Sequence, residues 1–501
     1  MALISVTPQP GVVTNGTDYQ NAGRWVDSNL IRFADGILQP IGGWDLLKST
    51  ALTGAPIGMY AYNDNSGNAV LAVGTREKVY VYYSYTLTWY DITPSGFVTP
   101  SSTDPLGFGA FTYGSEDYGD ARSESGLSFG GPSYSFDNWG QNLVFCCDSD
   151  GKIYEWDPSS PSTIAAAISN APTGCNAILV SNERHLVAIG SGDDPRKIQW
   201  SDREDNTSWT ATSVNSAGDL QIPTGGHALS AVKYKNDIII FTDTGLARMY
   251  FVASPLTYGI ADAGTNCKVI SPRAVVSVGE FIAWLGEKSI FVYDGTVKEI
   301  KCAVNDFIFD NIHAQYRKAT CGGSCSAFNE IWWFFPSGES QTPNKYIIWN
   351  YIDNTFAVGT LSRGAYIDEG VFEFPIAADN DGFVYYHESG NLFNSKGLGS
   401  SKPTATSGPI EISRGNNMMH ATQVIPDSEA STLPGVTLSF SGRFTPLGAE
   451  TDFGSATFEA DGFSDIRFTT KQMQMTVTGD VDQKWSLGNV RLDVTQGGSR
   501  R

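Results

Sequence analysis

The sequence is short of charged residues, and most of all of basic ones. Charged residues make up 17% of the 501 residues, against roughly 25% in an ordinary soluble domain. Only 33 lysines and arginines stand against 53 aspartates and glutamates, which gives a net charge of −20. This balance argues against a surface that grips a nucleic-acid backbone, because such surfaces concentrate basic residues. We therefore expect no specific binding of DNA.

Long apolar runs are also missing. The most apolar stretches, 238–241 and 331–335, are as short as a β-strand and far shorter than the ~20 residues that cross a bilayer. The first residues have neither the basic start nor the apolar core of a secretory signal. We expect no membrane span and no secretion. Seven cysteines in a chain with an ample core are expected to be free thiols in a reducing compartment.

Catalytic and metal-binding signatures are scarce as well. The five histidines lie 33 or more residues apart, and no metalloprotease, Gly-x-Ser-x-Gly or phosphate-loop pattern is present. Cys321 and Cys325 lack the second Cys or His pair that a zinc site needs. The acid-rich turns 148–151 and 379–382 could serve calcium or sugar chemistry, but Asx-Gly turns are also what hairpins require. We predict no catalytic residue, no metal site and no cofactor.

What the sequence does contain is strand and turn residues. Fifty-three glycines and 12% aromatic residues, without long stretches at helical spacing, predict an all-β protein with little helix. Between residues 51 and 395, a unit of apolar strands and short turns recurs about every 40 to 50 residues, the period of a four-stranded propeller blade. These units, of which the seventh is weak, predict an irregular β-propeller of about six to seven blades. The same repeats would also suit two stacked sandwiches.

Changes in composition predict the domain boundaries. Residues 1–50 are rich in turns and are expected to form an extended N-terminal segment that packs on the body or on a neighbour. The propeller-like body, 51–395, contains an insertion loop at 99–131 that is rich in Ser, Gly, Tyr and acidic residues. A linker at 396–408 leads to 409–501, where period-two alternation predicts a C-terminal antiparallel β-sandwich. The two chain ends could share a sheet, which leaves the blade count open.

Both ends of the chain carry motifs. The N-terminal motif residues are Gly23, Arg24, Trp25, Arg32, Gly42, Gly43 and Trp44, and the C-terminal ones are Trp485, Leu487, Gly488, Arg491 and Leu492. Together with the segment 243–300, these motifs resemble the tail hub proteins, also called nozzle or tail stabilisation proteins, of short-tailed bacteriophages. The insertion at 99–131 has no counterpart in this resemblance.

The resemblance implies a structural virion protein that is not an enzyme. It implies a ring of six copies below the portal and adaptor, with tail fibres or spikes at its sides and a needle or plug at its tip. Such a protein is assembled in the host cytoplasm and ends in the phage tail. Viral DNA would pass through the channel without specific binding, and acidic residues in the turns and in the 99–131 loop would repel it. The alternative is a receptor-binding or polysaccharide-degrading propeller protein of a phage tail.

Overall fold

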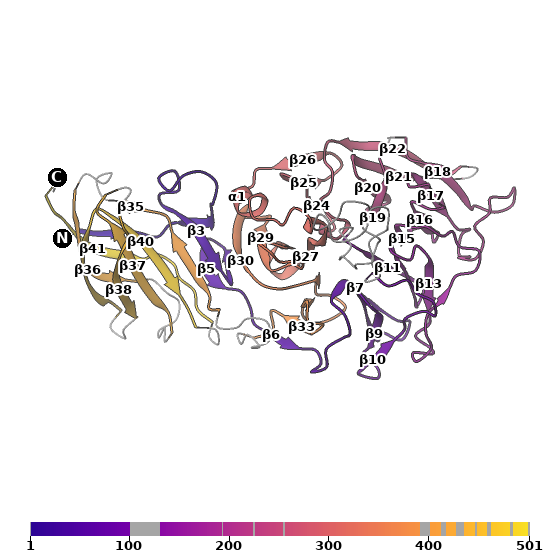
Figure 1. The fold of residues 1–501 in the computed structure, drawn as a ribbon, viewed down its shortest axis with the longest axis horizontal. Coiled ribbons are helices and arrows are strands. Elements are labelled where there is room, and N and C mark those ends of the chain that lie inside the picture. The colour runs from indigo at the N-terminus through magenta and orange to yellow at the C-terminus, as the bar shows by residue number, and fades with distance from the viewer. Residues whose placement is uncertain are drawn as a thin grey trace, which may run out of the picture.

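The computed structural model of the chain describes residues 2–100, 131–192, 194–223, 226–253, 256–390, 401–411, 417–426, 435–445, 448–457, 462–480 and 484–498. The predicted insertion loop at 99–131 lies almost entirely outside these ranges, and so does the start of the predicted linker. The described chain forms a β-propeller and a β-sandwich that lie side by side (Figure 1). Helix is scarce in these ranges, as predicted: α1 (Asn305–Phe309) is accompanied by three short 3-10 turns.

In the described part of the chain, seven four-stranded antiparallel sheets form the blades of the propeller. The predicted propeller is therefore confirmed, with seven blades, and the alternative of two stacked sandwiches for the same repeats is wrong. In blades 1 to 6 the four strands follow one another along the chain, so each sheet is built from local hairpins. These blades comprise β7 (Pro56–Asn63), β8 (Ala69–Thr75), β9 (Val79–Tyr83) and β10 (Thr88–Asp91); β11 (Tyr134–Trp139), β12 (Asn142–Cys147), β13 (Ile153–Trp156) and β14 (Ala166–Ala167); β15 (Ala177–Val180), β16 (Leu186–Ile189), β17 (Lys197–Trp200) and β18 (Gly218–Gln221); β19 (Ala228–Tyr234), β20 (Asp237–Thr242), β21 (Gly245–Ala253) and β22 (Thr257–Thr265); β23 (Val275–Ser277), β24 (Ile282–Leu285), β25 (Ile290–Tyr293) and β26 (Val297–Ile300); and β27 (Cys321–Cys325), β28 (Glu330–Phe335), β29 (Lys345–Asn350) and β30 (Thr355–Thr360).

Blade 7 takes its outer strand from the start of the chain. Three strands come from the end of the body, β31 (Ala365–Ile367), β32 (Ile376–Ala378) and β33 (Val384–His387). The fourth, β6 (Trp44–Leu46), pairs antiparallel with β33. This pairing closes the circle of blades. The end of the predicted N-terminal segment 1–50 is therefore part of the propeller itself instead of packing on its surface, because strand pairing across the whole body leaves no local pattern.

Hydrophobic clusters fill the interfaces between neighbouring blades. Alternation along each strand sends one set of side chains to each neighbouring blade, and five separate clusters lie between blades 7 and 1, 1 and 2, 2 and 3, 3 and 4, and 4 and 5. The largest cluster runs from blades 5 to 7 through the hairpin of β4 (Ile31–Ala34) and β5 (Ile37–Pro40) into the sandwich. The propeller and the sandwich therefore share one continuous core.

The sandwich contains strands from both ends of the chain. One sheet has the order β1 (Ala2–Ser5), β41 (Arg491–Gln496), β36 (Met419–Ile425) and β39 (Ser464–Thr470), and the other has the order β2 (Gln9–Val12), β3 (Arg24–Asn29), β34 (Thr404–Ser407), β40 (Gln472–Thr478), β37 (Thr437–Arg443) and β38 (Thr451–Thr457), with β35 (Ile410–Glu411) beside β40. Since β1 pairs with β41, the chain ends do share a sheet. The predicted boundaries need two corrections, because β1 to β3 come from the predicted N-terminal segment and β34 lies inside the predicted linker.

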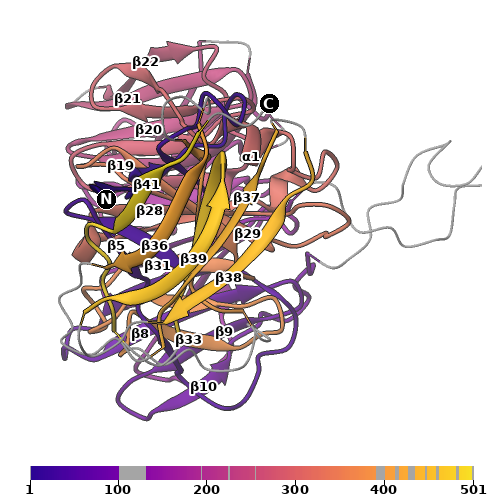
Figure 2. The same cartoon turned by 90° about the vertical axis from the view of Figure 1, so that its left-hand side faces the viewer.

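The N-terminal segment also covers the outer edge of blade 6. Strand β30 would otherwise leave a row of backbone groups without partners. The hydroxyl of Ser28 donates to the carbonyl of Val358 at 2.8 Å and accepts from the N–H of the same residue at 3.1 Å. Oδ1 of Asn29 accepts from the N–H of Thr360 at 2.9 Å. Figure 2 shows the sandwich strands β36 to β39 lying in front of the propeller blades.

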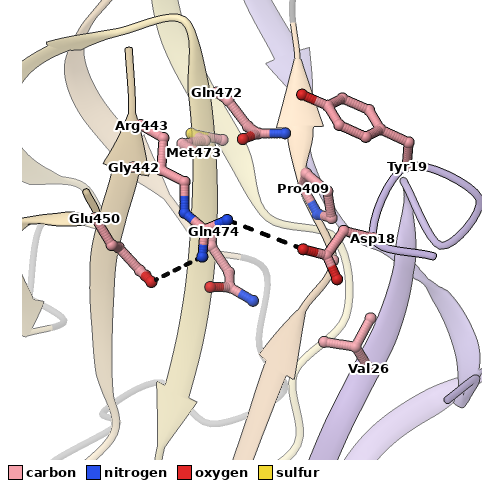
Figure 3. Close-up of a pocket in the computed structure, with 11 residues that line it drawn as sticks. Asp18, Tyr19, Val26, Pro409, Gly442, Arg443, Glu450, Gln472, Met473 and Gln474 are labelled. Atoms are coloured by element: carbon pink, nitrogen blue, oxygen red, sulfur yellow. Dashed lines mark hydrogen bonds and ion pairs between the residues drawn. The ribbon is translucent and has the colours of Figure 1, made fainter. Parts of the chain in front are cut away.

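The hollows among the described residues include a central cavity and a sandwich pocket. The central cavity, of about 520 Å³, lies in the middle of the propeller and is lined by the first strands of blades 1 to 5, namely β7, β11, β15, β19 and β23. The sandwich pocket, of about 200 Å³, lies between the N-terminal turn and the strands β37 and β40 (Figure 3). The sandwich pocket is lined by Asp18, Tyr19, Val26, Gly408, Pro409, Gly442, Arg443, Glu450, Gln472, Met473 and Gln474.

Candidate functional site

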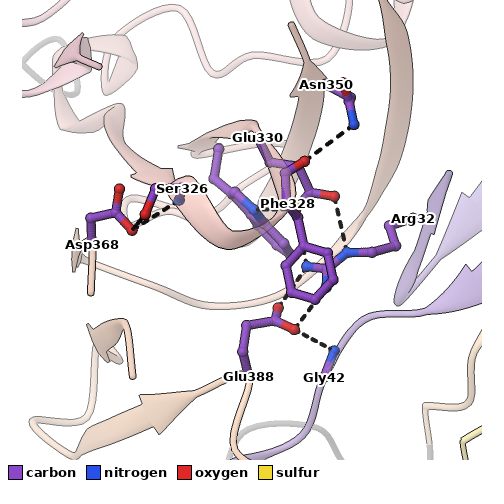
Figure 4. Close-up of polar contacts among 9 residues, drawn as sticks. Arg32, Gly42, Ser326, Phe328, Glu330, Asn350, Asp368 and Glu388 are labelled. Carbon is purple, nitrogen blue, oxygen red and sulfur yellow. Dashed lines mark hydrogen bonds and ion pairs between the residues drawn. The ribbon is translucent and has the colours of Figure 1, made fainter. Parts of the chain in front are cut away.

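Arg32, one of the N-terminal motif residues, lies at a buried junction between the hairpin β4–β5 and blades 6 and 7. Its guanidinium donates to both carboxylate oxygens of Glu330, at 2.9 and 3.0 Å. It also donates to both carboxylate oxygens of Glu388, at 2.7 and 2.8 Å (Figure 4). The ring of Phe328 lies 3.5 Å from the guanidinium carbon. The side chains of Arg32, Glu330 and Glu388 are 1%, 1% and 7% exposed. One guanidinium therefore connects the N-terminal segment to two blades.

Further donors satisfy the two carboxylates. The indole N–H of Trp332 donates to Oε2 of Glu330 at 3.1 Å, and the backbone N–H of Gly42 donates to Oε2 of Glu388 at 2.9 Å. A side chain at Gly42 would not fit, because an added Cβ would lie 2.7 Å from Cα of Glu388. The motif glycine thus allows the chain to approach the carboxylate closely. Every carboxylate oxygen at the junction has a donor, as buried charges require.

The junction holds two carboxylates against one guanidinium, which sets the protonation of Glu330. Burial raises the pKa of Glu330 from its ordinary value of 4.5 to about 7; Arg32 opposes this rise and the like charge of Glu388 adds to it. Burial alone would lower the pKa of Arg32, but the two carboxylates more than compensate and raise it above its ordinary value. Arg32 is therefore charged at every pH at which the protein folds.

The raised pKa predicts a pH-dependent stability that Glu330→Gln removes. A carboxyl whose pKa is higher in the folded chain stabilises the fold fully below about pH 4.5, and this contribution is lost as the pH rises through about 7. We expect the free energy of unfolding of the wild type to fall over this window, relative to Glu330→Gln, by on the order of 3 kcal/mol. Urea unfolding at pH 5, 6, 7 and 8 measures the difference. The exposed Glu77→Gln serves as the control and should follow the wild type; parallel curves for wild type and Glu330→Gln would contradict the prediction.

Trp44, a second motif residue, is fully buried where β6 closes blade 7. Its ring stacks on the imidazole of His387, with centroids 5.2 Å apart, and the guanidinium carbon of Arg363 lies 5.0 Å from the ring centroid. Nε of Arg363 donates to Nε2 of His387 at 2.9 Å. Burial and the nearby cations lower the pKa of His387 well below its ordinary value, and burial lowers the pKa of Arg363 to about 10. The imidazole is therefore neutral and can accept from Arg363.

The remaining N-terminal motif residues are divided between blade 7 and the sandwich. Gly43 exchanges backbone hydrogen bonds with the segment that follows β33, since its N–H donates to Gly390 and its carbonyl accepts from Ser389. Trp25, on β3, is buried in the shared core. The side chain of Arg24 donates to Gln9 across the parallel pair of β2 and β3, and Gly23 has a φ of +71° in the exposed turn before β3. Gly23, Arg24 and Trp25 thus lie on the sandwich side of the molecule, whereas Gly43 lies beside blade 7.

The C-terminal motif residues meet the N-terminal segment. Leu487 exchanges two backbone hydrogen bonds with Leu38 of β5, at 2.8 and 3.4 Å. On β41, Arg491 is exposed and pairs with Ser5, while the buried Leu492 pairs with Ile4. The carbonyl of Gly488 accepts from the hydroxyl of Thr7, and the ring of Trp485 is buried against Gly479. Strand β41 begins only at Arg491, so Trp485, Leu487 and Gly488 lie in the segment that precedes it.

The structure thus brings Arg32, Gly42 and Trp44 to one junction and places the C-terminal motif behind it, in the sandwich. The partners at this junction, Glu330, Glu388, His387 and Arg363, are not predicted from the sequence. Glu330 carries one usable signal, since a lone charged residue at the start of the apolar run 331–335 needs a partner when it is buried. The other partners lie in mixed segments that offer no such signal.

The central cavity offers one carboxylate among its described lining residues. Asp137 accepts from Nζ of Lys233 at 2.6 Å, from the hydroxyl of Tyr60 at 3.3 Å and from the N–H of Val180 at 2.7 Å. Glycoside hydrolases generally use a pair of carboxylates about 5–9.5 Å apart, one of them free to take or give a proton. Asp137 is instead held by a cation in a site without a second acid among those residues. This arrangement does not favour polysaccharide cleavage in the cavity.

The acid-rich turns have local structural roles. Asp148 accepts from the N–H of Ser133, Asp150 accepts from the hydroxyl of Tyr154, and Asp379 accepts from the hydroxyl of Tyr385. The hairpin interpretation of both turns is confirmed, since Gly151 and Gly382 have φ values of +66° and +89°. All seven cysteines are buried and free. Within the described ranges, no three His, Cys, Asp or Glu residues are grouped to hold a metal ion, and no helix is long and apolar enough to cross a membrane.

Comparison with known proteins gives no family for this chain. No family model matches the chain, and no curated protein matches it. The β-propeller domain of Cps50 (Swd1) from Myceliophteria thermophila is 10% identical, with a TM-score of 0.38, over 68% of this chain and 98% of that one. An exo-β-1,3-galactanase from Phanerochaete chrysosporium, solved with galactose, is 10% identical, with a TM-score of 0.30, over 91% of this chain and 100% of that one. Likenesses with TM-scores this low carry no argument about fold or activity.

Proposed function

We propose that the chain is a structural subunit of the ring-shaped tail hub, or nozzle, of a short-tailed bacteriophage. The observation that carries this proposal is the buried junction at which Arg32 and Trp44 hold blades 6 and 7. The C-terminal motif supports the same region from the sandwich side, through Leu487 and Leu492. These four residues line neither the central cavity nor the sandwich pocket. Their contacts hold the propeller and the sandwich in one fixed relation.

A fixed relation between two domains suits a ring subunit. In a closed ring each subunit meets its neighbours through two different surfaces, and a rotation between the domains would displace one of these surfaces relative to the other. The shared core and the buried ion pairs oppose such a rotation. An enzyme would need an open site with free catalytic groups, and Asp137 in the central cavity is already bound to Lys233.

The rest of the proposal follows the resemblance of the chain ends. The ring contains six copies below the portal and adaptor, and it contacts tail fibres or spikes at its sides and a needle or plug at its tip. The protein belongs to the virion and is assembled in the host cytoplasm. The net charge of −20 on each copy supports a channel that repels viral DNA and lets it pass.

Electron microscopy and native mass spectrometry of the purified chain, alone and mixed with its portal and adaptor rings, test this proposal. We expect closed rings of six copies that stack on the adaptor, because a hub subunit must assemble without any turnover of substrate. The same preparation is assayed for release of reducing ends from host capsule and cell-wall polysaccharide.

A monomer that depolymerises polysaccharide would overturn the proposal in favour of a polysaccharide-degrading tail protein. If the chain does cleave polysaccharide, Asp137→Asn locates the active site, since loss of turnover in this variant would place the reaction in the central cavity. A monomer that adheres to host cells without cleaving their polysaccharide would equally contradict the ring and would favour a receptor-binding protein.

A further inference from the structure

The sandwich pocket is built on the outer face of a sheet. Strands β37 and β40 pair so that Arg443 lies opposite Gln472, and alternation places Gln474 on the same face two residues further along β40. The N-terminal turn at 17–23 covers one side of this face (Figure 3). Gly408 allows the close approach of the turn, since an added Cβ would lie 2.3 Å from the carbonyl oxygen of Asn21.

The polar groups of the pocket are planar and converge on the same space. Arg443 lies between two carboxylates, 3.9 Å from Asp18 and 3.4 Å from Glu450, as the dashed lines in Figure 3 show. The amide nitrogens of Gln472 and Gln474 donate to Glu411 and Ser407. Among the described residues no hydrogen bond reaches the amide oxygen of either glutamine. The pocket thus offers both donors and acceptors to a bound molecule.

An aromatic ring and an apolar wall complete the pocket. Tyr19 is 49% exposed on the turn, and both Tyr19 and Pro409 line the pocket (Figure 3). Val26 adds apolar surface to the same lining. An exposed ring with hydrogen-bonding groups around it suits a ligand that has both an apolar face and a polar edge.

Charge and size narrow the class of ligand. Arg443, Asp18 and Glu450 together carry one formal negative charge, which disfavours an anion. The guanidinium of Arg443 already lies between the two carboxylates, which disfavours a second cation there. A neutral ligand with hydroxyl groups therefore fits best. The volume of about 200 Å³ is below the roughly 300–1,000 Å³ of pockets that hold drug-sized ligands. The pocket therefore has room for one small ring and not for a chain.

The geometry points to a saccharide-binding site in the sandwich pocket, which takes one neutral pyranose unit. The apolar face of the sugar packs on Tyr19, and its hydroxyl groups bond with Gln472, Gln474, Arg443 and the two carboxylates. This site lies in the sandwich, away from the central cavity, and its occupation requires no ring and no other protein. The inference goes beyond the proposed function and does not depend on it.

Titration of the full chain with D-glucose, D-galactose and N-acetyl-D-glucosamine, followed by saturation-transfer NMR and calorimetry, tests the inference. We expect at least one of the three sugars to bind in the millimolar range. Tyr19→Ala should weaken this binding about tenfold, which corresponds to about 1.4 kcal/mol, at the upper end of what an aromatic contact contributes beyond the area it buries. Gln472→Ala, on the rigid sheet, should weaken it as well.

Tyr85→Ala is the matched control. Tyr85 is also an exposed tyrosine, 75% accessible, and it lies in the turn between β9 and β10 of blade 1. This variant should bind sugar as the wild type does. The inference is overturned if none of the three sugars binds the wild type, or if Tyr19→Ala binds as tightly as the wild type. A closed ring that binds no sugar would reject this site and leave the proposed function standing.

Discussion

Replacing Arg32 by methionine is expected to lower the free energy of unfolding at pH 7 by about 3–5 kcal/mol, because it leaves buried carboxylates without their cation. Methionine keeps much of the side-chain volume but removes four hydrogen bonds to Glu330 and Glu388, together with the contact on Phe328. Urea unfolding followed by circular dichroism measures the loss. Because the carboxylates can take up protons, the loss should be smaller at pH 5 than at pH 7.

Two further variants separate the effect of the buried charges from that of losing an exposed ion pair. Lys78→Met removes an ion pair whose two side chains are 42% and 40% exposed, and such pairs contribute about 0–1 kcal/mol. Arg32→Met combined with Glu330→Gln removes one of the stranded carboxylates and should recover part of the stability. If Arg32→Met lowers the free energy of unfolding no more than Lys78→Met does, the buried ion pairs at the junction do not hold the propeller and the sandwich together.

The repeated strands predict the propeller because each blade is built from neighbouring hairpins. In blade 4 the apolar stretches at 228–232, 237–241 and 246–250, which form one of these recurring units, lie in β19, β20 and β21. Strand β11 is not predicted, because only its aromatic residues suggest burial and its polar ones resemble a loop. The outer strand β14 of blade 2 is not predicted either, since it has two residues, both exposed. Short turns between apolar strands can be recognised from neighbouring residues in the sequence. Edge strands with few apolar residues cannot be recognised in this way.

Of the residues at the junction between the propeller and the sandwich, the sequence predicts only those from the N-terminal segment. The resemblance of the N-terminal segment to a family names Arg32 and Trp44, but their partners are far away in the sequence, with Glu330 and Glu388 lying 298 and 356 residues from Arg32. Neither composition nor periodicity relates residues at such separations. For the same reason the segment 1–50 is predicted as one extended lead-in, whereas it supplies strands to the sandwich, the hairpin at the junction and the last strand of blade 7.

Replacing Trp44 by alanine is expected to lower the free energy of unfolding by about 3–5 kcal/mol, the range for removing a large buried aromatic side chain. The indole is fully buried, stacks on His387 and lies against Arg363, so its loss leaves a cavity where β6 closes the propeller. Trp89→Ala, on the outer strand of blade 1, is the matched control and should cost less, because Trp89 is only half-buried. Chemical unfolding of both variants measures the two losses. Strand β6 completes blade 7. If both variants lower the free energy of unfolding equally, closure of the propeller by this N-terminal strand contributes no more to stability than a half-buried tryptophan on an outer strand does.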